Sequence, residues 1–378
     1  MAILDKVKPL TEKQKQVLAA LGSKDVDLVG VFGPSGSGKS LLTCSYGIDS
    51  LEKGEYRCFV IMRPLADVLG GKGYSAADLG ETYFSLASAY LFDLLTPYVE
   101  REVLEGYLKE GKVVLADPTF LRGRTFDNSL ILLDDSQNAA PDVIVESLIR
   151  LGKDSKLVIA GDPLLQVAGG VNGAVLAREL LLGEERAIVI DLGYKDIVRP
   201  GAKRGFKLAL EMRLRKRELS EEERKVRDLA QVHAPDADIV TVVDLRDLKS
   251  KYGVTNVPDM LIVSKEGYLG RLIGKGGERI NKIEKDSGLA LRAVELTMDF
   301  RNMIRALHPL GWIGKHLVDA ELVGPALEVT VSSREFGAFM GQRGAFIRFI
   351  SEAFGRMMGI SVRARPVEVE REKKKRKK

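Results

Sequence analysis

The chain has 378 residues, of which 45% are hydrophobic and 29% charged, a balance typical of globular proteins with two or three domains. Its net charge of +5 comes from the end of the chain, because residues 371–378 hold seven basic side chains and one acidic one. The sequence contains no apolar run of about 18 residues, so no spanning helix and no membrane partner are expected, and the segment MAILDKVKPL is not expected to act as a secretory signal. The 2 cysteines and 3 histidines show neither a disulfide framework nor zinc spacing, and a cytoplasmic location is expected.

Short apolar runs alternate with longer helical patterns through the first half of the chain. Buried strands are predicted at 26–32, 57–62, 113–116, 129–133, 156–160 and 187–191. Helices are predicted at 39–51, 81–98, 141–151 and 173–182. This alternation predicts an α/β domain whose mostly parallel sheet is flanked by helices.

A glycine-rich segment follows the first predicted strand and leads directly into the first helix. It consists of Gly33, Pro34, Ser35, Gly36, Ser37, Gly38, Lys39 and Ser40. A strand, GxxxxGK[ST] and a helix in this order form a P-loop, whose backbone N–H groups surround a phosphate at the helix N-terminus. Lys39 is expected to reach the β- and γ-phosphates, and Ser40 to place its hydroxyl on the metal. The sequence therefore predicts ATP and Mg²⁺ as cofactors.

Two adjacent acids, Asp134 and Asp135, follow the predicted strand at 129–133. Strand ends of a parallel sheet meet at the carboxyl edge, so these acids are expected beside the P-loop. Asp134 is the expected metal-side carboxylate, and Asp135 is placed to orient or deprotonate the attacking water. Adjacent acids at a strand end can also be a plain turn, and their meaning comes from the P-loop upstream.

The run LRGRTF at 121–126, followed by LILLDDSQN at 130–138, resembles the RGRTF…LDEAQN stretch of PhoH-like ATPases, relatives of the superfamily 1 helicase core. Arg63-Pro64 and the segment 79–81 resemble further motifs of the family, so that the resemblance covers roughly residues 8–212. The chain departs from the family pattern at Asp135, where the family has Glu, and at Thr82, where it has Lys.

The resemblance also implies roles for three further residues. Gln14, in LTEKQ, matches the helicase glutamine that reads adenine. Gln166 follows Gly161-Asp162, a pair that resembles the third helicase motif, although one residue more than usual separates them. Arg199 ends a D-I-V-R element and is the candidate arginine finger or sensor. Family resemblance further implies a homo-oligomer, with a hexameric ring as one form, in which Arg199 reaches a neighbouring nucleotide.

Beyond residue 203 the alternation of apolar runs and helical patterns ends, and a mixed-charge stretch and an internal repeat follow. The mixed-charge stretch 213–227 is predicted to be a solvated connecting helix. Residues 268–288 then align without gaps on 335–355, which predicts two copies of one small domain. Each copy is preceded by a strand, at 260–264 and 327–331, and followed by another, at 289–296 and 360–364.

Each copy carries a G-x-x-G loop between two short helices. The loop residues are Gly274, Lys275, Gly276 and Gly277 in the first copy, and Gly341, Gln342, Arg343 and Gly344 in the second. Both copies resemble KH domains of the prokaryotic type, in which this loop clamps the backbone of single-stranded RNA. Arg271, Arg279 and Lys282 make the first copy the more basic. The alternative is a degenerate KH-like fold used for protein contacts.

The predicted organisation is a PhoH-like ATPase domain at 1–215, KH domains at 216–297 and 298–366, and a basic tail at 367–378. The predicted function is an RNA-binding ATPase that couples hydrolysis of Mg-ATP to the binding or remodelling of single-stranded RNA. The alternative is a nucleotide-regulated RNA adaptor with little or no turnover. A metabolic P-loop kinase is disfavoured by the repeat and by the RGRTF element.

Overall fold

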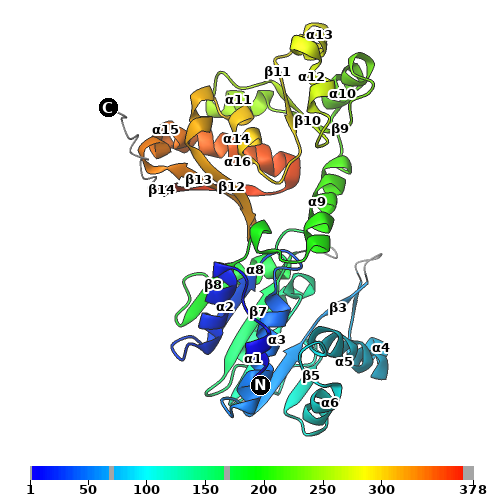
Figure 1. Cartoon of the computed structure of the whole chain (residues 1–378), viewed down its shortest axis with the longest axis vertical. Helices are drawn as coiled ribbons and strands as arrows, with labels where there is room; N and C mark the ends of the chain where they lie inside the picture. The colour runs from blue at the N-terminus through cyan, green and yellow to red at the C-terminus, as the bar shows by residue number, and fades with distance from the viewer. Residues whose placement is uncertain (1, 68–71, 166–170, 369–378) are drawn as a thin grey trace, which may run out of the picture. The chain divides into compact units, whose positions relative to one another are not determined.

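The computed structural model describes residues 2–67, 72–165 and 171–368. The chain divides into two units, which are described separately (Figure 1). The first contains residues 1–206 and the short turn 323–325, and the second contains 207–322 and 326–378. The first unit ends within helix α9 (Pro200–Arg215), whereas the sequence places the boundary at 215.

A six-stranded sheet forms the centre of the first unit, with the strand order β5-β2-β6-β7-β1-β8. Every neighbouring pair is parallel. The strands are β1 (Leu28–Phe32), β2 (Cys58–Met62), β5 (Val113–Ala116), β6 (Ser129–Leu133), β7 (Lys156–Gly161) and β8 (Ala187–Asp191). The predicted α/β class with a parallel sheet is thus confirmed.

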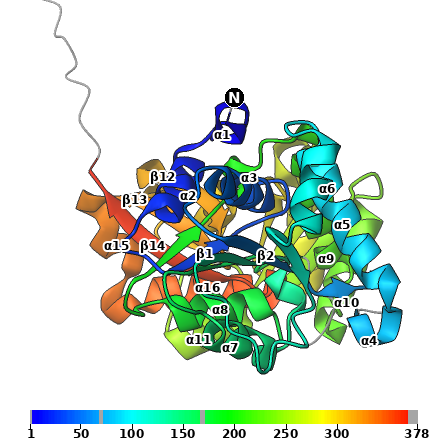
Figure 2. The same cartoon turned by 90° about the horizontal axis from the view of Figure 1, so that it is seen from below.

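Helices cover both faces of this sheet, as Figure 2 shows. Along β6 the side chains alternate, so Leu130 and Leu132 enter one core while Ile131 and Leu133 enter the other. Burying each such side chain stabilises the fold by roughly 1.5–3 kcal/mol. On one face lie α2 (Glu12–Gly22), α3 (Lys39–Glu52), α5 (Glu81–Leu95) and α6 (Arg101–Lys109); on the other lie α7 (Pro141–Ile149) and α8 (Gly173–Leu181).

The first unit also contains the short elements α1 (Ile3–Lys6), β3 (Leu65–Ala66), β4 (Gly73–Tyr74) and α4 (Ala76–Leu79), and two 3₁₀ helices at Ser136–Asn138 and Tyr194–Asp196. Helix α5 ends at Leu95, three residues before the predicted end, and α7 and α8 also end slightly early. Within the described residues of both units, no helix combines the length and the apolar character needed to cross a bilayer.

The second unit holds two copies of a strand–helix–loop–helix–strand frame. The first copy contains α10 (Glu221–His233), β9 (Ile239–Asp244), α11 (Arg246–Tyr252), β10 (Met260–Ser264), α12 (Leu269–Ile273), α13 (Glu278–Ser287) and β11 (Leu291–Glu295). The second contains α14 (Arg301–Leu307), β12 (Leu317–Val323), β13 (Ala326–Ser332), α15 (Phe336–Met340), α16 (Ala345–Met358) and β14 (Ser361–Val367). Each copy has a three-stranded sheet, in the orders β11-β10-β9 and β12-β13-β14.

The structure confirms the internal repeat at the level of single residues. Helices α12 and α15 begin at Leu269 and Phe336, and α13 and α16 begin at Glu278 and Ala345, so both pairs keep the offset seen in the sequence. The strands before and after the helices are parallel in both copies.

The prediction of one continuous helix over 213–227 is wrong. Helix α9 ends at Arg215, and α10 begins only after Ser220. The Ser220 hydroxyl accepts a hydrogen bond from the Glu223 backbone N–H at 3.2 Å, and the Glu223 carboxylate accepts one from the Ser220 N–H at 2.9 Å. This capping box starts a new helix inside the charged stretch. In the second copy a 3₁₀ helix occupies Gly311–His316, directly before β12 begins at Leu317.

Candidate functional sites

The P-loop joins the carboxyl end of β1 to the N-terminus of α3, and its backbone requires glycine at several positions. Gly36 and Gly38 have φ angles of 85° and 92°, which L side chains rarely adopt. A Cβ on Gly36 would lie 2.5 Å from the Cβ of Ala202, and one on Gly33 would lie 2.6 Å from the Cβ of Leu192. The loop is therefore enclosed closely by other segments of its own chain.

Lys39 is buried inside this loop, with 7% of its surface exposed. Its Nζ donates to the backbone oxygens of Gly33 at 2.7 Å and Pro34 at 3.0 Å. Burial lowers the pKa of Lys39, while the charges of Asp162, Asp134 and Asp135 act in the opposite direction. Lys39 thus carries the cation that faces the acids at the sheet edge, where a polyphosphate would lie.

Asp134 follows β6 and is almost completely buried, with 1% of its surface exposed. Its Oδ2 accepts a hydrogen bond of 2.5 Å from the Tyr90 hydroxyl, whereas its Oδ1 has no partner in the described part of the chain. Burial and the charge of Asp135 raise the pKa of Asp134, and hydrogen bonds from Tyr90 and Ser40 oppose this rise.

A buried carboxylate oxygen without a partner, next to a serine hydroxyl, fits a hard cation such as Mg²⁺. Asp134 and Ser40 are the residues that would hold it. When bound, such an ion neutralises charge on phosphate oxygens and holds them in position.

Asp135 is paired with Arg63, which follows β2. The Arg63 NH2 and Nε lie 2.6 Å and 2.8 Å from Asp135 Oδ2, and the guanidinium covers the Tyr90 ring at 4.1 Å from its centre. Asp135 has a φ of 49°, the left-handed conformation that non-glycine residues adopt at a cost of roughly 1–2 kcal/mol. The pairing of Asp135 with Arg63 and the role of Tyr90 were not predicted from the sequence.

Gln137 links Asp135 to the motif after β7. Its Nε2 donates to Asp135 Oδ1 at 3.1 Å, and its Oε1 accepts from the Asp162 N–H at 2.9 Å. A Cβ on Gly161 would lie 3.0 Å from this Oε1 and would collide with the Ser136 hydroxyl, so only glycine leaves room for the link. The sequence analysis did not select Gln137, although the DDSQN run that carries the family resemblance contains it.

Gln14 and Arg199 both lie against the P-loop. The Gln14 Nε2 donates to the Ser37 oxygen at 2.8 Å, and its Oε1 accepts from the Leu10 N–H at 2.7 Å. The Arg199 Nε lies 3.6 Å from the position of a Cβ on Gly36 of the same chain. Gln14 therefore braces the loop, and its reading of adenine stays a prediction. The predicted sensor Gln166 lies outside the described residues.

The two G-x-x-G loops have nearly the same backbone. Gly276 and Arg343, at equivalent positions, have φ angles of 63° and 51°, and Gly274 and Gly341 have 75° and 74°. In the first copy Arg279 is ion-paired with Asp236 and also donates to the Arg271 backbone oxygen. The Arg271 guanidinium lies 4.6 Å from the centre of the Tyr268 ring, and Lys275 is exposed.

In the second copy the loop residues Gln342 and Arg343 are exposed, as is Arg348 on the helix that follows. Because Arg279 is neutralised by Asp236, the first copy is less basic than its sequence suggests. The basic tail at 371–378 lies outside the described residues.

A strand–P-loop–helix unit at the carboxyl edge of a parallel sheet, with buried acids at the neighbouring strand end, defines a P-loop nucleoside triphosphatase. The family model for PhoH-like protein matches residues 6–211, and the chain belongs to this family.

The chain is 31% identical to the PhoH-like protein of Bacillus subtilis over 191 residues, which cover 50% of this chain and 59% of that protein. It is 28% identical to the PhoH-like protein of a Synechocystis species over 199 residues, or 51% and 58% of the two chains. It thus spans less than two thirds of the length of these curated relatives. Among solved structures, the large terminase of a thermophilic bacteriophage matches with a TM-score of 0.37 and 13% identity, over 55% of this chain and 51% of that one.

Proposed function

We propose that this chain is an RNA-associated ATPase. Mg-ATP binds at the P-loop, Lys39 contacts the β- and γ-phosphates, and Ser40 and Asp134 hold the metal. Asp135 orients the attacking water, and Arg199 stabilises the charge that develops in the transition state. The observation that carries this proposal is the convergence of Lys39, Asp134 and Asp135 at one sheet edge, where the charges of both acids act on buried Lys39.

The repeats of the second unit supply the RNA site in this proposal. Two loops with matched left-handed backbone, each before a helix and exposed to solvent, support the interpretation of both copies as KH domains. Lys275 and Lys282 in the first copy and Arg343 in the second are the side chains that contact phosphates. The position of Arg199 beside Gly36 of its own chain favours action within one chain. We further propose that the protein is cytoplasmic and forms a homo-oligomer, of which a hexameric ring is one form.

The experiment that tests this function is steady-state phosphate release from ATP, with and without single-stranded RNA. We expect Mg²⁺-dependent hydrolysis that RNA accelerates. Hydrolysis that RNA leaves unchanged would contradict coupling, and phosphate transfer to a small molecule would indicate a kinase.

A nucleotide-regulated adaptor with little turnover is the second candidate, and one observation favours it. Arg63 and Gln137 engage both carboxylate oxygens of Asp135, which leaves Asp135 fewer positions at which to accept a hydrogen bond from water in this conformation. A single-turnover measurement separates the two functions, because an adaptor retains bound ATP for many minutes whereas an ATPase converts it to ADP.

A further inference from the structure

Two antiparallel helices, α11 of the first repeat and α16 of the second, contact each other in the second unit. Arg356 donates to both carboxylate oxygens of Asp247 at 2.7 Å. One turn further along both helices, Lys251 donates to Glu352 at 2.8 Å, and the Tyr252 hydroxyl donates to the same carboxylate at 2.5 Å. The contacts thus proceed in steps of four residues, as expected for one face of each helix.

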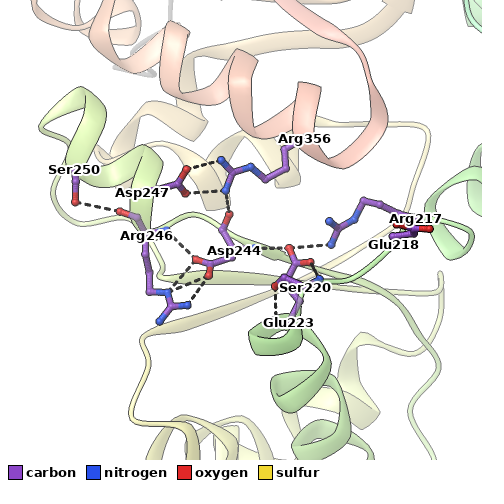
Figure 3. Close-up of a pocket in the computed structure, with 9 residues that line it drawn as sticks. All are labelled: Arg217, Glu218, Ser220, Glu223, Asp244, Arg246, Asp247, Ser250 and Arg356. Atoms are coloured by element: carbon purple, nitrogen blue, oxygen red, sulfur yellow. Dashed lines mark hydrogen bonds and ion pairs between the residues drawn. The ribbon is translucent and has the colours of Figure 1, made fainter.

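In the cavity at one end of this contact, the lining side chains pair with one another, as Figure 3 shows. Its volume is about 660 Å³, and its arginines are paired with acids that also line it. Besides the Asp247 pair, Arg246 lies 2.6 Å from Asp244 and Arg217 lies 3.0 Å from Glu223. Because its cations are already compensated, this cavity is part of the structural contact between the repeats.

The cavity at the other end differs in this respect. A further step of four residues along each helix leads to Thr255 and Arg348. Helix α11 has already ended at Tyr252, however, because Gly253 adopts a left-handed conformation there. Arg348 therefore has no partner from the first repeat in the described part of the chain, and a cavity of about 690 Å³ remains, with Tyr252, Asn256, Arg343, Phe346 and Arg348 among its lining residues. Arg343 and Arg348 are its only charged lining residues, and neither forms an ion pair within the described residues.

At this cavity the backbone of Arg343 is strained, although the fold does not require an arginine at this position. Arg343 has a φ of 51°, whereas the equivalent position of the first repeat is Gly276, which adopts this conformation without cost. An arginine is thus held where glycine would be more stable, and its exposed side chain forms no hydrogen bond or ion pair within the described residues that would offset the strain. Backbone strain of this kind is enriched at ligand sites.

The aromatic rings at the cavity are held in place by contacts outside it. The Tyr252 hydroxyl is bound by Glu352, and Phe346 packs edge-on against His308 with ring centres 5.3 Å apart. Phe346 also covers Gly341, where a Cβ would lie 2.5 Å from the ring. Asn256 presents an exposed amide, while its backbone oxygen is held by Arg292 at 2.8 Å. The cavity therefore offers aromatic rings, an amide and two uncompensated cations.

We propose that this cavity binds one unpaired nucleotide of single-stranded RNA, with the base against Phe346 and Tyr252 and the phosphate on Arg343 and Arg348. Asn256 supplies a donor and an acceptor for the edge of the base. The proposal rests on the proposed RNA binding by the repeats and adds a site built from both of them. The proposed site also gives the second G-x-x-G loop a role in RNA binding even though this loop lacks the lysine of the first loop.

The test uses the full chain, fluorescence anisotropy and a labelled oligouridine, with duplex RNA of the same length for comparison. Arg343→Gly should weaken oligouridine binding and reduce the salt slope by about 0.7, as expected for one lost phosphate contact. The same substitution should raise the thermal midpoint, because glycine relieves the strain. Phe346→Leu keeps apolar volume but loses the planar face, and should weaken binding about tenfold. Binding of the duplex, whose bases are already stacked, should not change with Phe346→Leu.

Arg224→Gln is the matched control, because it removes an equal charge from an exposed position on α10 outside the cavity. If Arg343→Gly and Phe346→Leu bind oligouridine like Arg224→Gln, while Asp at both Lys275 and Gly276 abolishes binding, the composite site is overturned and RNA binding stands. If the unmodified chain binds no oligouridine, the proposed function itself fails.

Discussion

The P-loop and the first G-x-x-G loop are both glycine-rich and both lead into a helix, but their surroundings differ. A Cβ on Gly36 of the P-loop would lie 2.5 Å from Ala202, whereas a Cβ on Gly276 would meet no described atom within 4 Å. Lys39 is buried and lies near three acids, whereas Lys275 is exposed. An enclosed loop suits a ligand that is surrounded on all sides, and an open loop suits a polymer that continues past it.

This difference explains why the P-loop motif alone predicts its ligand from the sequence, whereas the G-x-x-G motif alone does not. The P-loop carries its chemistry within eight consecutive residues, and its neighbours hold that segment in one shape. The G-x-x-G loop fixes only a turn, and its charge depends on distant residues such as Asp236, which neutralises Arg279. Substitutions in the two loops should therefore affect different quantities.

The largest expected effect is that of Lys39→Ala. Removing the cation that faces the phosphates should lower ATP hydrolysis by at least about 10²–10³-fold, as the loss of one group that stabilises transition-state charge does. Lys275→Ala is the matched substitution in the open loop and should leave the basal rate unchanged. Phosphate release measures both, with circular dichroism to show that each variant is folded. A folded Lys39→Ala protein with the unmodified rate would contradict the P-loop assignment.

The two acids after β6 should differ in the step that they support. Asp134→Asn removes the buried metal-side carboxylate, so we expect loss of Mg²⁺-dependent activity and weaker nucleotide binding. Asp135→Asn should slow turnover by about 10²-fold or more while nucleotide stays bound, because the metal-side groups remain. Binding of a fluorescent ATP analogue, measured alongside turnover, separates these outcomes. Equal loss of nucleotide affinity in both variants would show that the division of roles is wrong.

Arg199→Ala should reduce hydrolysis far more than ATP binding, by up to about 10³-fold if this guanidinium acts as an arginine finger. Because Arg199 lies beside Gly36 of its own chain, a mixture of Arg199→Ala and Lys39→Ala proteins should recover no activity. Co-purification of two differently tagged variants must first show that the mixture assembles. Recovery in such a mixture would mean that Arg199 acts on a neighbouring nucleotide.

The smallest expected effects are changes in the free energy of unfolding when a glycine of either loop is replaced by alanine. Gly276→Ala meets only the backbone cost of its left-handed conformation, about 1 kcal/mol. Gly36→Ala adds a collision with Ala202, and should cost a further 1–3 kcal/mol or so, as overpacking does. Urea unfolding of each full-length variant gives both values. Equal destabilisation by the two substitutions would mean that the P-loop is no more enclosed than the open loop.

Much of the fold follows from local sequence, since β5, β6 and β8 occupy the predicted residues. Each is a short apolar run between polar residues, so its limits are set locally. The charge pattern over 213–227 predicts a single helix, but the Ser220 capping box, which is also a local signal, starts a second helix within this stretch.

The contacts around the acids could not be predicted, because they join residues far apart in the chain. Tyr90 lies on α5 and reaches Asp134 after β6, and Arg63 after β2 reaches Asp135. Motif spacing identified both acids but contained no signal for their partners. The cavity lined by Asn256, Arg343 and Phe346 could not be predicted for the same reason, because the end of α11 and the start of α16 meet only in the folded unit.

The most direct test of the central claim measures whether RNA on the repeats controls ATP hydrolysis at the P-loop. Steady-state ATPase rates are compared, with and without oligouridine, for the unmodified chain and for a variant with Asp in place of both Lys275 and Gly276. The variant places two negative charges where the RNA backbone must approach, and it leaves the P-loop residues unaltered. We predict RNA stimulation in the unmodified chain and its loss in the variant, with equal basal rates. Equal stimulation of both proteins would contradict the claim that the repeats couple RNA to the nucleotide site.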